Sequence, residues 1–312
     1  MATYGNKARA FRSGGKIPVD LGVNDAVLRM GGISGNVFWV HSGTGSNGNP
    51  GTSPEVPMAT IDAAVGLCTA NKGDVIYVMP GHAENISAAT SLVVDVAGVS
   101  IIGLGNARNR PALTFTATAG SIEMDAANTV LSNLRLIAGI ASVVVGVNVD
   151  ADDVTLDSLE FDISATGYEF LLMVDVDAFD RTVIRNCVFK AENIAGTNTG
   201  IRLDDTIGAS IVDCVFRGDF TTAAISGTAG SAAASVDTAI IGCLIENLDT
   251  TAGLVIDLHD NGTGLISDCR GFTLYATAPE TALDSGNALV CETYVVNAVD
   301  ESGTIVPVTL ST

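Results

Sequence analysis

One aspartate recurs in each of four successive repeats in the middle of this chain, directly after a short pair of hydrophobic residues. The four are Asp125, Asp150, Asp177 and Asp204. Carboxylates stacked at strand spacing repel one another, so such a column needs a cation, hydrogen-bond donors or solvent around it. Carboxylate oxygens are ligands that Ca²⁺ accepts. The simpler interpretation, which we favour, is that each Asp accepts backbone N–H bonds in a turn.

Polysaccharide cleavage by an acidic pair is a second possibility. A glycosidase needs two carboxylates about 5 to 9.5 Å apart. By position, Asp175 could pair with Asp177, but Asp204 and Asp205 could share a face only at a bend, because consecutive strand residues point opposite ways. A lyase needs a positioned base near an acidic metal site. The basic candidates are Arg185, Lys190, Arg202 and Arg217, of which Lys190 and Arg217 fit a surface charge ladder more simply.

These residues lie within a pattern that occurs six times between Leu131 and Phe272. It consists of an aliphatic residue, two mostly polar residues, a Leu or Cys, any residue, and then usually Leu, Ile or Phe. Successive copies are 25, 28, 27, 29 and 26 residues apart. A spacing in the twenties that varies by one or two residues is typical of a solenoid.

The residue types favour strands. The last two columns of the pattern are two residues apart, and a second pair with the same spacing, such as Val147 and Val149, precedes the Leu/Cys column by 10 or 11 residues in most repeats. Each repeat therefore carries at least two short strands. The predicted fold is all-β, a right-handed single-stranded parallel β-helix (solenoid), with neighbouring coils about 4.8 Å apart.

The Leu/Cys column should form a ladder inside this coil. Its members are Leu134, Leu159, Cys187, Cys214, Cys243 and Cys269. Metal binding and disulfide formation are the alternatives, but one thiol per repeat lacks the paired CxxC spacing of a zinc site. We therefore interpret the cysteines as packing residues, since free thiols are among the most buried side chains. The sequence predicts no cofactor.

Composition limits the possible partners. The 312 residues are 47% hydrophobic and only 16% charged, with a net charge of −20. The acidity argues against nucleic acid, and no stretch reaches the roughly 18 apolar residues of a membrane span, so we expect no membrane partner. No charged-then-apolar leader opens the sequence, and free cysteines are typical of a reducing cytoplasm, so we expect synthesis there.

The N-terminal segment has the opposite charge. Residues 1–36 hold five basic and two acidic side chains, hence +3, which leaves −23 on the remainder. The segment is rich in glycine and shows no amphipathic period. It could be an exposed arm that becomes ordered on a partner, or a tail or irregular first cap. The candidate contact residues are Lys7, Arg9, Arg12, Lys16 and Arg29.

The segment between this arm and the repeats contains three connected motifs. They are residues 38–46 (FWVHSGTGS), 57–65 (PMATIDAAV) and 73–82 (GDVIYVMPGH). Ile61, Ala64 and Val65 have helical spacing, which predicts a short amphipathic capping helix. Together the motifs resemble the opening module of right-handed parallel β-helix proteins of the pectate-lyase-like class. The resemblance covers residues 37–83 closely and the repeats generically. It is specific for fold.

Within that class, the chain resembles virion proteins of tailed bacteriophages. The resemblance implies either a capsid decoration (cement) protein or a tail spike, commonly a homotrimer. We favour decoration, with the major capsid protein as partner and the virion surface as location. The alternative is a tail spike that binds or degrades host polysaccharide. The expected parts are an extended arm (1–36), the opening module (37–83), the parallel β-helix (84–292) and a C-terminal cap or oligomer contact (293–312).

Overall fold

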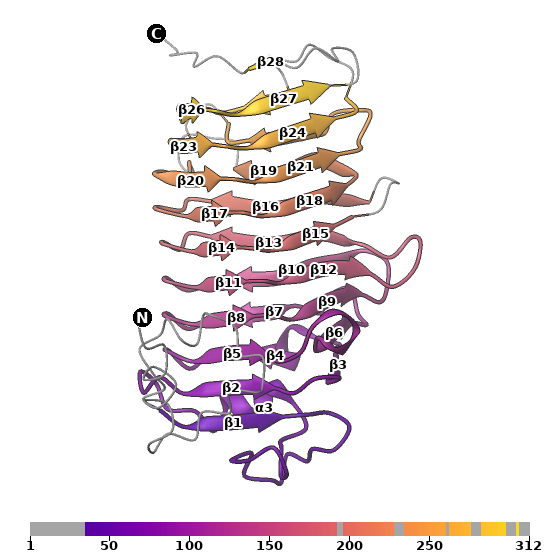
Figure 1. Cartoon of the computed structure of the whole chain (residues 1–312), viewed down its shortest axis with the longest axis vertical. Coiled ribbons are helices and arrows are strands. Elements are labelled where there is room, and N and C mark those ends of the chain that lie inside the picture. The colour runs from indigo at the N-terminus through magenta and orange to yellow at the C-terminus, as the bar shows by residue number, and fades with distance from the viewer. Residues whose placement is uncertain are drawn as a thin grey trace, which may run out of the picture. The chain divides into compact units, whose positions relative to one another are not determined.

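The computed structural model describes residues 35–191, 196–227, 234–259, 262–275, 282–297 and 304–305. Within them the chain forms three sheets of parallel strands, and each coil contributes one strand to each sheet (Figure 1). The prediction of an all-β parallel solenoid is confirmed, with about eight turns and almost no helix. The right-handed sense of the coil stays a prediction.

The sheets are named A, B and C. Sheet A consists of β1 (Val37–Val40), β2 (Val75–Val78), β5 (Ser100–Gly103), β8 (Val130–Ser132), β11 (Thr155–Asp157), β14 (Val183–Arg185), β17 (Ser210–Val212), β20 (Thr238–Ile241), β23 (Gly264–Ser267) and β26 (Leu289–Cys291). Sheet B consists of β3 (Ala83–Ile86), β6 (Ala112–Phe115), β9 (Arg135–Ala138), β12 (Glu160–Ile163), β15 (Val188–Lys190), β18 (Val215–Gly218), β21 (Leu244–Asn247), β24 (Arg270–Thr273), β27 (Tyr294–Asn297) and β28 (Thr304–Ile305). Sheet C consists of β4 (Leu92–Val93), β7 (Ile122–Met124), β10 (Val143–Val149), β13 (Phe170–Asp177), β16 (Thr197–Asp204), β19 (Phe220–Gly227), β22 (Leu254–Asp257) and β25 (Leu283–Asp284).

Parallel pairing extends beyond residues 84–292 at both ends. Strand β1 begins sheet A by pairing with β2, and β27 continues sheet B by pairing with β24. Strand β28 pairs antiparallel with β27, so the chain reverses direction there. The predicted opening module and the predicted C-terminal segment therefore both contribute strands to the sheets. Residues 1–34, which include all five candidate arm residues, lie outside the described residues.

A short helix forms where the opening module predicted one. Helix α3 (Ile61–Val65) begins after Thr60, whose hydroxyl accepts a hydrogen bond from the Ala63 N–H, and its Ile61, Ala64 and Val65 are buried in the core. Two single turns of 3₁₀ helix, η1 (Ala89–Ser91) and η2 (Ala107–Asn109), complete the helical residues that the structure describes. The capping role of α3 stays a prediction.

The corner between sheets A and B has the same backbone conformation in successive coils. One residue per coil has a left-handed φ of 47° to 67°, and these residues are Asn133, Ser158, Asn186, Asp213, Gly242, Asp268 and Glu292. From Asn133 to Asp268, the N–H of each corner residue donates to a carbonyl of the next coil. Asn, Asp and Gly tolerate this conformation best, which explains the polar residue that stands before each Leu or Cys of the ladder.

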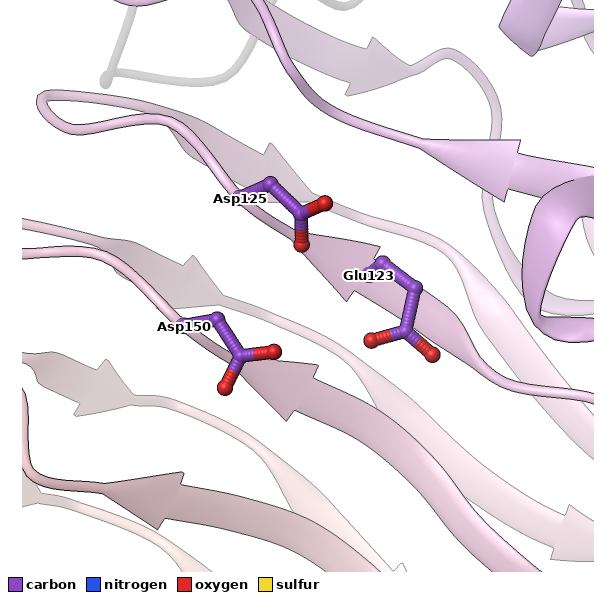
Figure 2. Close-up of side chains that lie close together, drawn as sticks. All are labelled: Glu123, Asp125 and Asp150. Atoms are coloured by element: carbon purple, nitrogen blue, oxygen red, sulfur yellow. The ribbon is translucent and has the colours of Figure 1, made fainter.

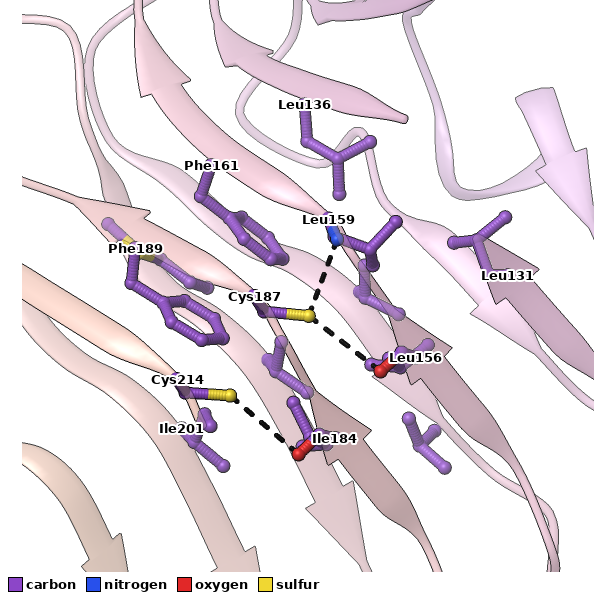
Figure 3. Packing of buried hydrophobic residues seen from close by; sticks show 14 of the residues in the cluster. Leu131, Leu136, Leu156, Leu159, Phe161, Ile184, Cys187, Phe189, Ile201 and Cys214 are labelled. Carbon is purple, nitrogen blue, oxygen red and sulfur yellow. Dashed lines mark hydrogen bonds between the residues drawn. The ribbon is translucent and has the colours of Figure 1, made fainter. Parts of the chain in front are cut away.

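The residue after each corner points into the core. The six ladder residues Leu134, Leu159, Cys187, Cys214, Cys243 and Cys269 are all buried, and the Sγ of Cys214 donates to the carbonyl of Ile184 one coil away (Figure 3). Two residues further on, Phe161, Phe189 and Phe216 stack with ring centroids 5.0 and 4.5 Å apart. All six cysteines are free, and the metal-competent cluster in the described residues contains no cysteine.

The hydrophobic pair is missing from the sequence between Leu203 and Ile256, so no second strand was predicted in this repeat. Strand β19 instead continues sheet C, with Ile225 opposite Ile201 and Gly227 opposite Leu203. A register shift next to Thr197 and the glycine at the second position hid this strand from a search for paired aliphatic residues. Residues 228–233 lie outside the described part of the chain.

The corner conformation predicts opposite effects for two substitutions. Glu292→Gly should stabilise the fold by about 0.5 kcal/mol, because glycine relieves left-handed strain but also loosens the unfolded chain. Gly242→Ala should destabilise it by about 1 kcal/mol or more, because the new Cβ would lie 2.4 Å from Asp213 Oδ1. Urea unfolding of the two variants measures both effects. Equal changes of the unfolding free energy, with the same sign in both variants, would contradict the left-handed corner conformation assigned to Gly242 and Glu292.

The burial of the ladder predicts the order of thiol reactivity. Cys291 is exposed and should react first with a disulfide reagent. Cys68 should react slowly, because burial and the nearby Asp74 raise its pKa to about 12. The four ladder thiols should react only after unfolding, when all six become available. A Cys291→Ser control should remove the fast phase, and fast labelling of the ladder thiols in native protein would contradict the packing interpretation.

Candidate functional site

The outer face of sheet C carries two adjacent columns of polar side chains. Because Ile122, Val147, Val174 and Ile201 point inward in register, their neighbours Glu123, Asn148, Asp175 and Arg202 point outward in register. Two residues further on, the predicted column of Asp125, Asp150, Asp177 and Asp204 follows the same spacing. The sequence prediction identified this second column. It missed Glu123, although a period of two from Asp125 marks it.

Three of these carboxylates form a compact cluster. Oxygen atoms of Glu123, Asp125 and Asp150 all lie within 4.8 Å of one another (Figure 2). The side-chain amide of Asn148 lies between two of them, with its nitrogen 2.9 Å from Glu123 Oε2 and 2.8 Å from Asp150 Oδ2. The Ser121 hydroxyl also donates to Glu123. Neutral donors therefore offset part of the repulsion between the carboxylates.

Two carboxyl groups of the cluster have raised pKa values. Burial raises the pKa of Asp125, and the charges of Glu123 and Asp95 add to this effect. Burial also raises the pKa of Asp150, with further contributions from Glu123, Asp125, Asp175 and Asp177. Asp95, which precedes Asp125 in the same column, was not among the sequence candidates. Five successive coils thus place an aspartate at this edge of sheet C.

The other half of the predicted column is arranged differently. Asp177 and Asp204 are register partners at the ends of β13 and β16, and neither belongs to the cluster of Glu123, Asp125 and Asp150. Beside them Asp175 binds Arg202 in a bidentate pair, with N–O distances of 2.8 and 2.6 Å. This pair raises the pKa of Arg202, so the guanidinium stays protonated. Of the two carboxylates considered for a glycosidase pair, Asp175 is thus engaged in an ion pair.

A shallow groove adjoins the cluster. It has a volume of about 410 Å³ and runs along the start of β10. Its lining residues are Thr118, Ala119, Gly120, Ser121, Glu123, Val144, Val145, Asn148, Asp150, Asp175 and Asp177. Val144 is 52% exposed, so the groove combines an apolar side with an acidic side. Glu123, Asp125 and Asp150 could supply three of the six to eight oxygen ligands that Ca²⁺ takes.

The other basic candidates are engaged in ion pairs. Arg185 binds Asp157 across adjacent coils, at 3.0 Å. Lys190 binds Glu160, and its nitrogen is 4.0 Å from Asp162. Arg217 binds Glu246 at 2.6 Å. The surface charge ladder expected for Lys190 and Arg217 therefore has Glu160 as the main partner of Lys190.

The structure also brings together a Ser, a His and a Glu that the sequence spacing did not suggest. His82 is buried, its Nδ1 accepts from the Ser42 N–H at 3.0 Å, and its Nε2 lies 3.0 Å from Glu84 Oε2. Glu84 also accepts from the Ile61 N–H at the start of α3. The Ser42 hydroxyl accepts from the Ala83 N–H. Because His82 contacts the backbone of Ser42, this network fastens the opening loop to the first coil and is not a nucleophile–base pair.

Comparisons with known proteins identify the fold. The solenoid is similar to a solved structure of a rhamnogalacturonan lyase, with a TM-score of 0.58 and 13% identity over 87% of this chain and 78% of that chain. A pectin methylesterase from Aspergillus niger gives a TM-score of 0.48 and 14% identity over 85% and 87% of the two chains. A GH136 lacto-N-biosidase from Eubacterium ramulus gives 0.48 and 11% over 87% and 69%.

The likeness to the rhamnogalacturonan lyase supports the parallel β-helix fold that the opening module suggested, and at 13% identity it concerns the fold alone. No protein-family model matches the sequence, and no curated protein matches it either. Among the described residues, no helix is both long and apolar enough to cross a membrane.

The raised pKa of Asp150 predicts that the substitution Asp150→Asn increases the stability of the protein, and that the increase depends on pH. A raised pKa means that the ionised carboxylate destabilises the native state near neutral pH, and that this cost disappears as the pH falls below the unfolded value of about 3.9. The substitution should therefore stabilise the protein by about 0.5 kcal/mol at pH 7, since a part-exposed group is screened, and by little at pH 3.5. Thermal unfolding at both pH values measures this.

Asp153→Asn is the matched control. A hydrogen bond from Arg181 lowers the pKa of Asp153, so its ionised form stabilises the native state at neutral pH. This variant should lose stability at pH 7 and lose less as the pH falls through the lowered pKa. If both variants shift the unfolding temperature in the same direction at pH 7, the electrostatic account of the cluster is wrong.

Proposed function

We propose that this chain is a non-enzymatic structural protein of a tailed-phage virion, of the capsid decoration type. In this proposal the N-terminal region binds the major capsid protein and the coil projects outward from the lattice. The resemblance of the chain to virion proteins of tailed bacteriophages, with its opening module, few lysines and many Ala, Gly and Thr residues, supports it. The structural observation that carries it is the engagement of seven of the described basic side chains in ion pairs with carboxylates.

These ion pairs mostly connect one coil to a neighbouring one. Among the described residues they involve Arg110, Arg135, Arg181, Arg185, Lys190, Arg202 and Arg217. A surface ion pair contributes little stability by itself. It does, however, hold the basic side chain in one position and in its protonated form. Arg202, in the same outward column as Glu123, is thereby unsuited to act as a general base.

A tail spike that binds or degrades polysaccharide is the second candidate. The groove beside Glu123 and Asp150 favours it, because that groove offers one carboxyl group of raised pKa, that of Asp150, next to an apolar wall. The likeness of the fold to a rhamnogalacturonan lyase is compatible with the same idea. The raised pKa of Asp150 would suit a general acid. A lyase reaction needs a general base, and the ion pair with Asp175 keeps Arg202 protonated, which counts against that role.

Deletion of residues 1–36 tests the decoration proposal. The truncated chain should keep its sheet signature in circular dichroism but bind capsids lacking the protein at least about tenfold more weakly, a loss of 1.4 kcal/mol or more. A full-length variant with Lys7, Arg9, Arg12, Lys16 and Arg29 all changed to Ser should lose affinity in the same direction. Changing the exposed Arg108 and Arg270 to Ser is the control for lost positive charge elsewhere.

Undiminished capsid binding by the truncated chain would refute the anchoring role of the arm. Incubation with host capsular polysaccharide separates the two candidates. A fall in viscosity with the native protein, abolished by Asp150→Asn, would favour the enzymatic alternative. Counting copies per particle gives an independent answer, since a decoration protein occupies the capsid lattice in far larger numbers than a spike occupies the tail.

A further inference from the structure

The outer face of sheet A changes character toward the C-terminal end. On β17, β20, β23 and β26 the middle residues Ile211, Ile240, Ile266 and Val290 point into the core. Their neighbours on each strand therefore point outward. We call these outward residues the neutral patch. Its large members are Val212, Ile241, Leu265 and Leu289, and its small members are Ser210, Ala239, Ser267 and Cys291.

The neutral patch carries no acidic or basic side chain, although the chain as a whole has a net charge of −20. On the preceding strands of the same face, Asp157 and Arg185 form an ion pair that marks the boundary of the patch. Leu289 is 53% exposed, and the exposed Ile207 and Val236 adjoin the patch where the chain enters β17 and β20. The largest apolar patch on a typical monomer covers about 300 to 600 Å² and is often functional.

The order of large and small residues makes the patch complementary to itself. On β17 and β20 the small residue comes first and the large one second, whereas on β23 and β26 this order is reversed. A two-fold rotation about an axis parallel to the strands places Val212 opposite Cys291 and Ile241 opposite Ser267. A two-fold axis parallel to the stack of coils instead places Leu289 opposite Cys291. In either arrangement every large residue meets a small one.

We propose that the neutral patch is a two-fold contact between two copies of this chain. Two bodies of charge −20 repel each other, and the neutral patch itself places no like charges opposite one another, although the exposed corner residues Asp213, Asp268 and Glu292 border it. An axis parallel to the stack of coils keeps these carboxylates apart, whereas an axis parallel to the strands brings Asp213 opposite Glu292. Self-complementary packing is what a two-fold interface requires, because the same residues stand on both sides. This contact differs from the homotrimer that the family resemblance implied, which stays a prediction.

The size of the patch sets the strength of the contact. Four strands about 4.8 Å apart, with the flanking turns, cover roughly 400 Å² on each copy. Stable interfaces bury about 800 Å² per partner, so this dimer forms only at high concentration. Chains held side by side on a common surface reach effective concentrations of about 1 mM, at which a weak contact is populated.

Sedimentation velocity and cysteine cross-linking test the contact on the full chain. Between about 10 µM and 1 mM, the average mass should rise from the 31.8 kDa monomer toward twice that value. Val212→Cys should cross-link to Cys291 of the second copy if the axis follows the strands. Leu289→Cys should do so if the axis follows the stack. Adding Cys291→Ser to either variant should abolish the cross-link.

Two lysine variants complete the test. Ile241→Lys places a charge in the middle of the neutral patch and should keep the protein monomeric at every concentration. Val188→Lys, at an outward position of β15 on sheet B, is the matched control and should associate as the native chain does. A native protein that stays monomeric at about 1 mM, an unaffected Ile241→Lys variant, or a trimer in which neither cysteine cross-links would overturn the proposal.

Discussion

The fold depends on a left-handed corner residue that recurs after seven successive strands of sheet A, from β8 to β26. From Asn133 to Asp268, the N–H of this residue donates to the next coil. Because the corner is fixed, the residue after it enters the core, and the residue two further on lies in the column that holds the stacked Phe161, Phe189 and Phe216. An irregular corner would shift the register by one and move the ladder to the surface.

The uniform corners also determine which side chains the outer face of each sheet presents to solvent. Since side chains alternate along a strand, each sheet presents columns of equivalent residues to solvent, and a single residue type repeated over several coils becomes a surface of one character. Sheet C collects carboxylates, sheet B collects alternating ion pairs, and the end of sheet A collects neutral side chains. The cluster of Glu123, Asp125 and Asp150 forms because equivalent residues of successive coils line up in columns on the outer face.

The sequence predicted the parts of the structure that repeat. The spacing of the Leu/Cys column and of the paired aliphatic residues was enough for the coil, its parallel strands and its interior, because each inward position is chosen by the same packing in every turn. Strand β19 was missed because a glycine and a register shift break the pattern locally.

The candidate site was only half predictable for a related reason. The Asp column is visible as a repeat, but its partners differ from coil to coil. The Asn148 side chain donates to the carboxylates of Glu123 and Asp150. Two coils later, Arg202 forms a bidentate ion pair with Asp175. The His82 network joins residues 40 positions apart with no periodicity at all. Contacts that occur once in a structure leave no repeated signal in the sequence.

The backbone pairing links residues that are about one turn apart, so the strands of each coil pair only with those of the coil before it and the coil after it. A whole coil could be duplicated or lost by a change in the gene, and the neighbours on either side would still find matching columns. Length is therefore a variable that evolution can adjust in this protein in steps of about 4.8 Å, leaving both ends intact.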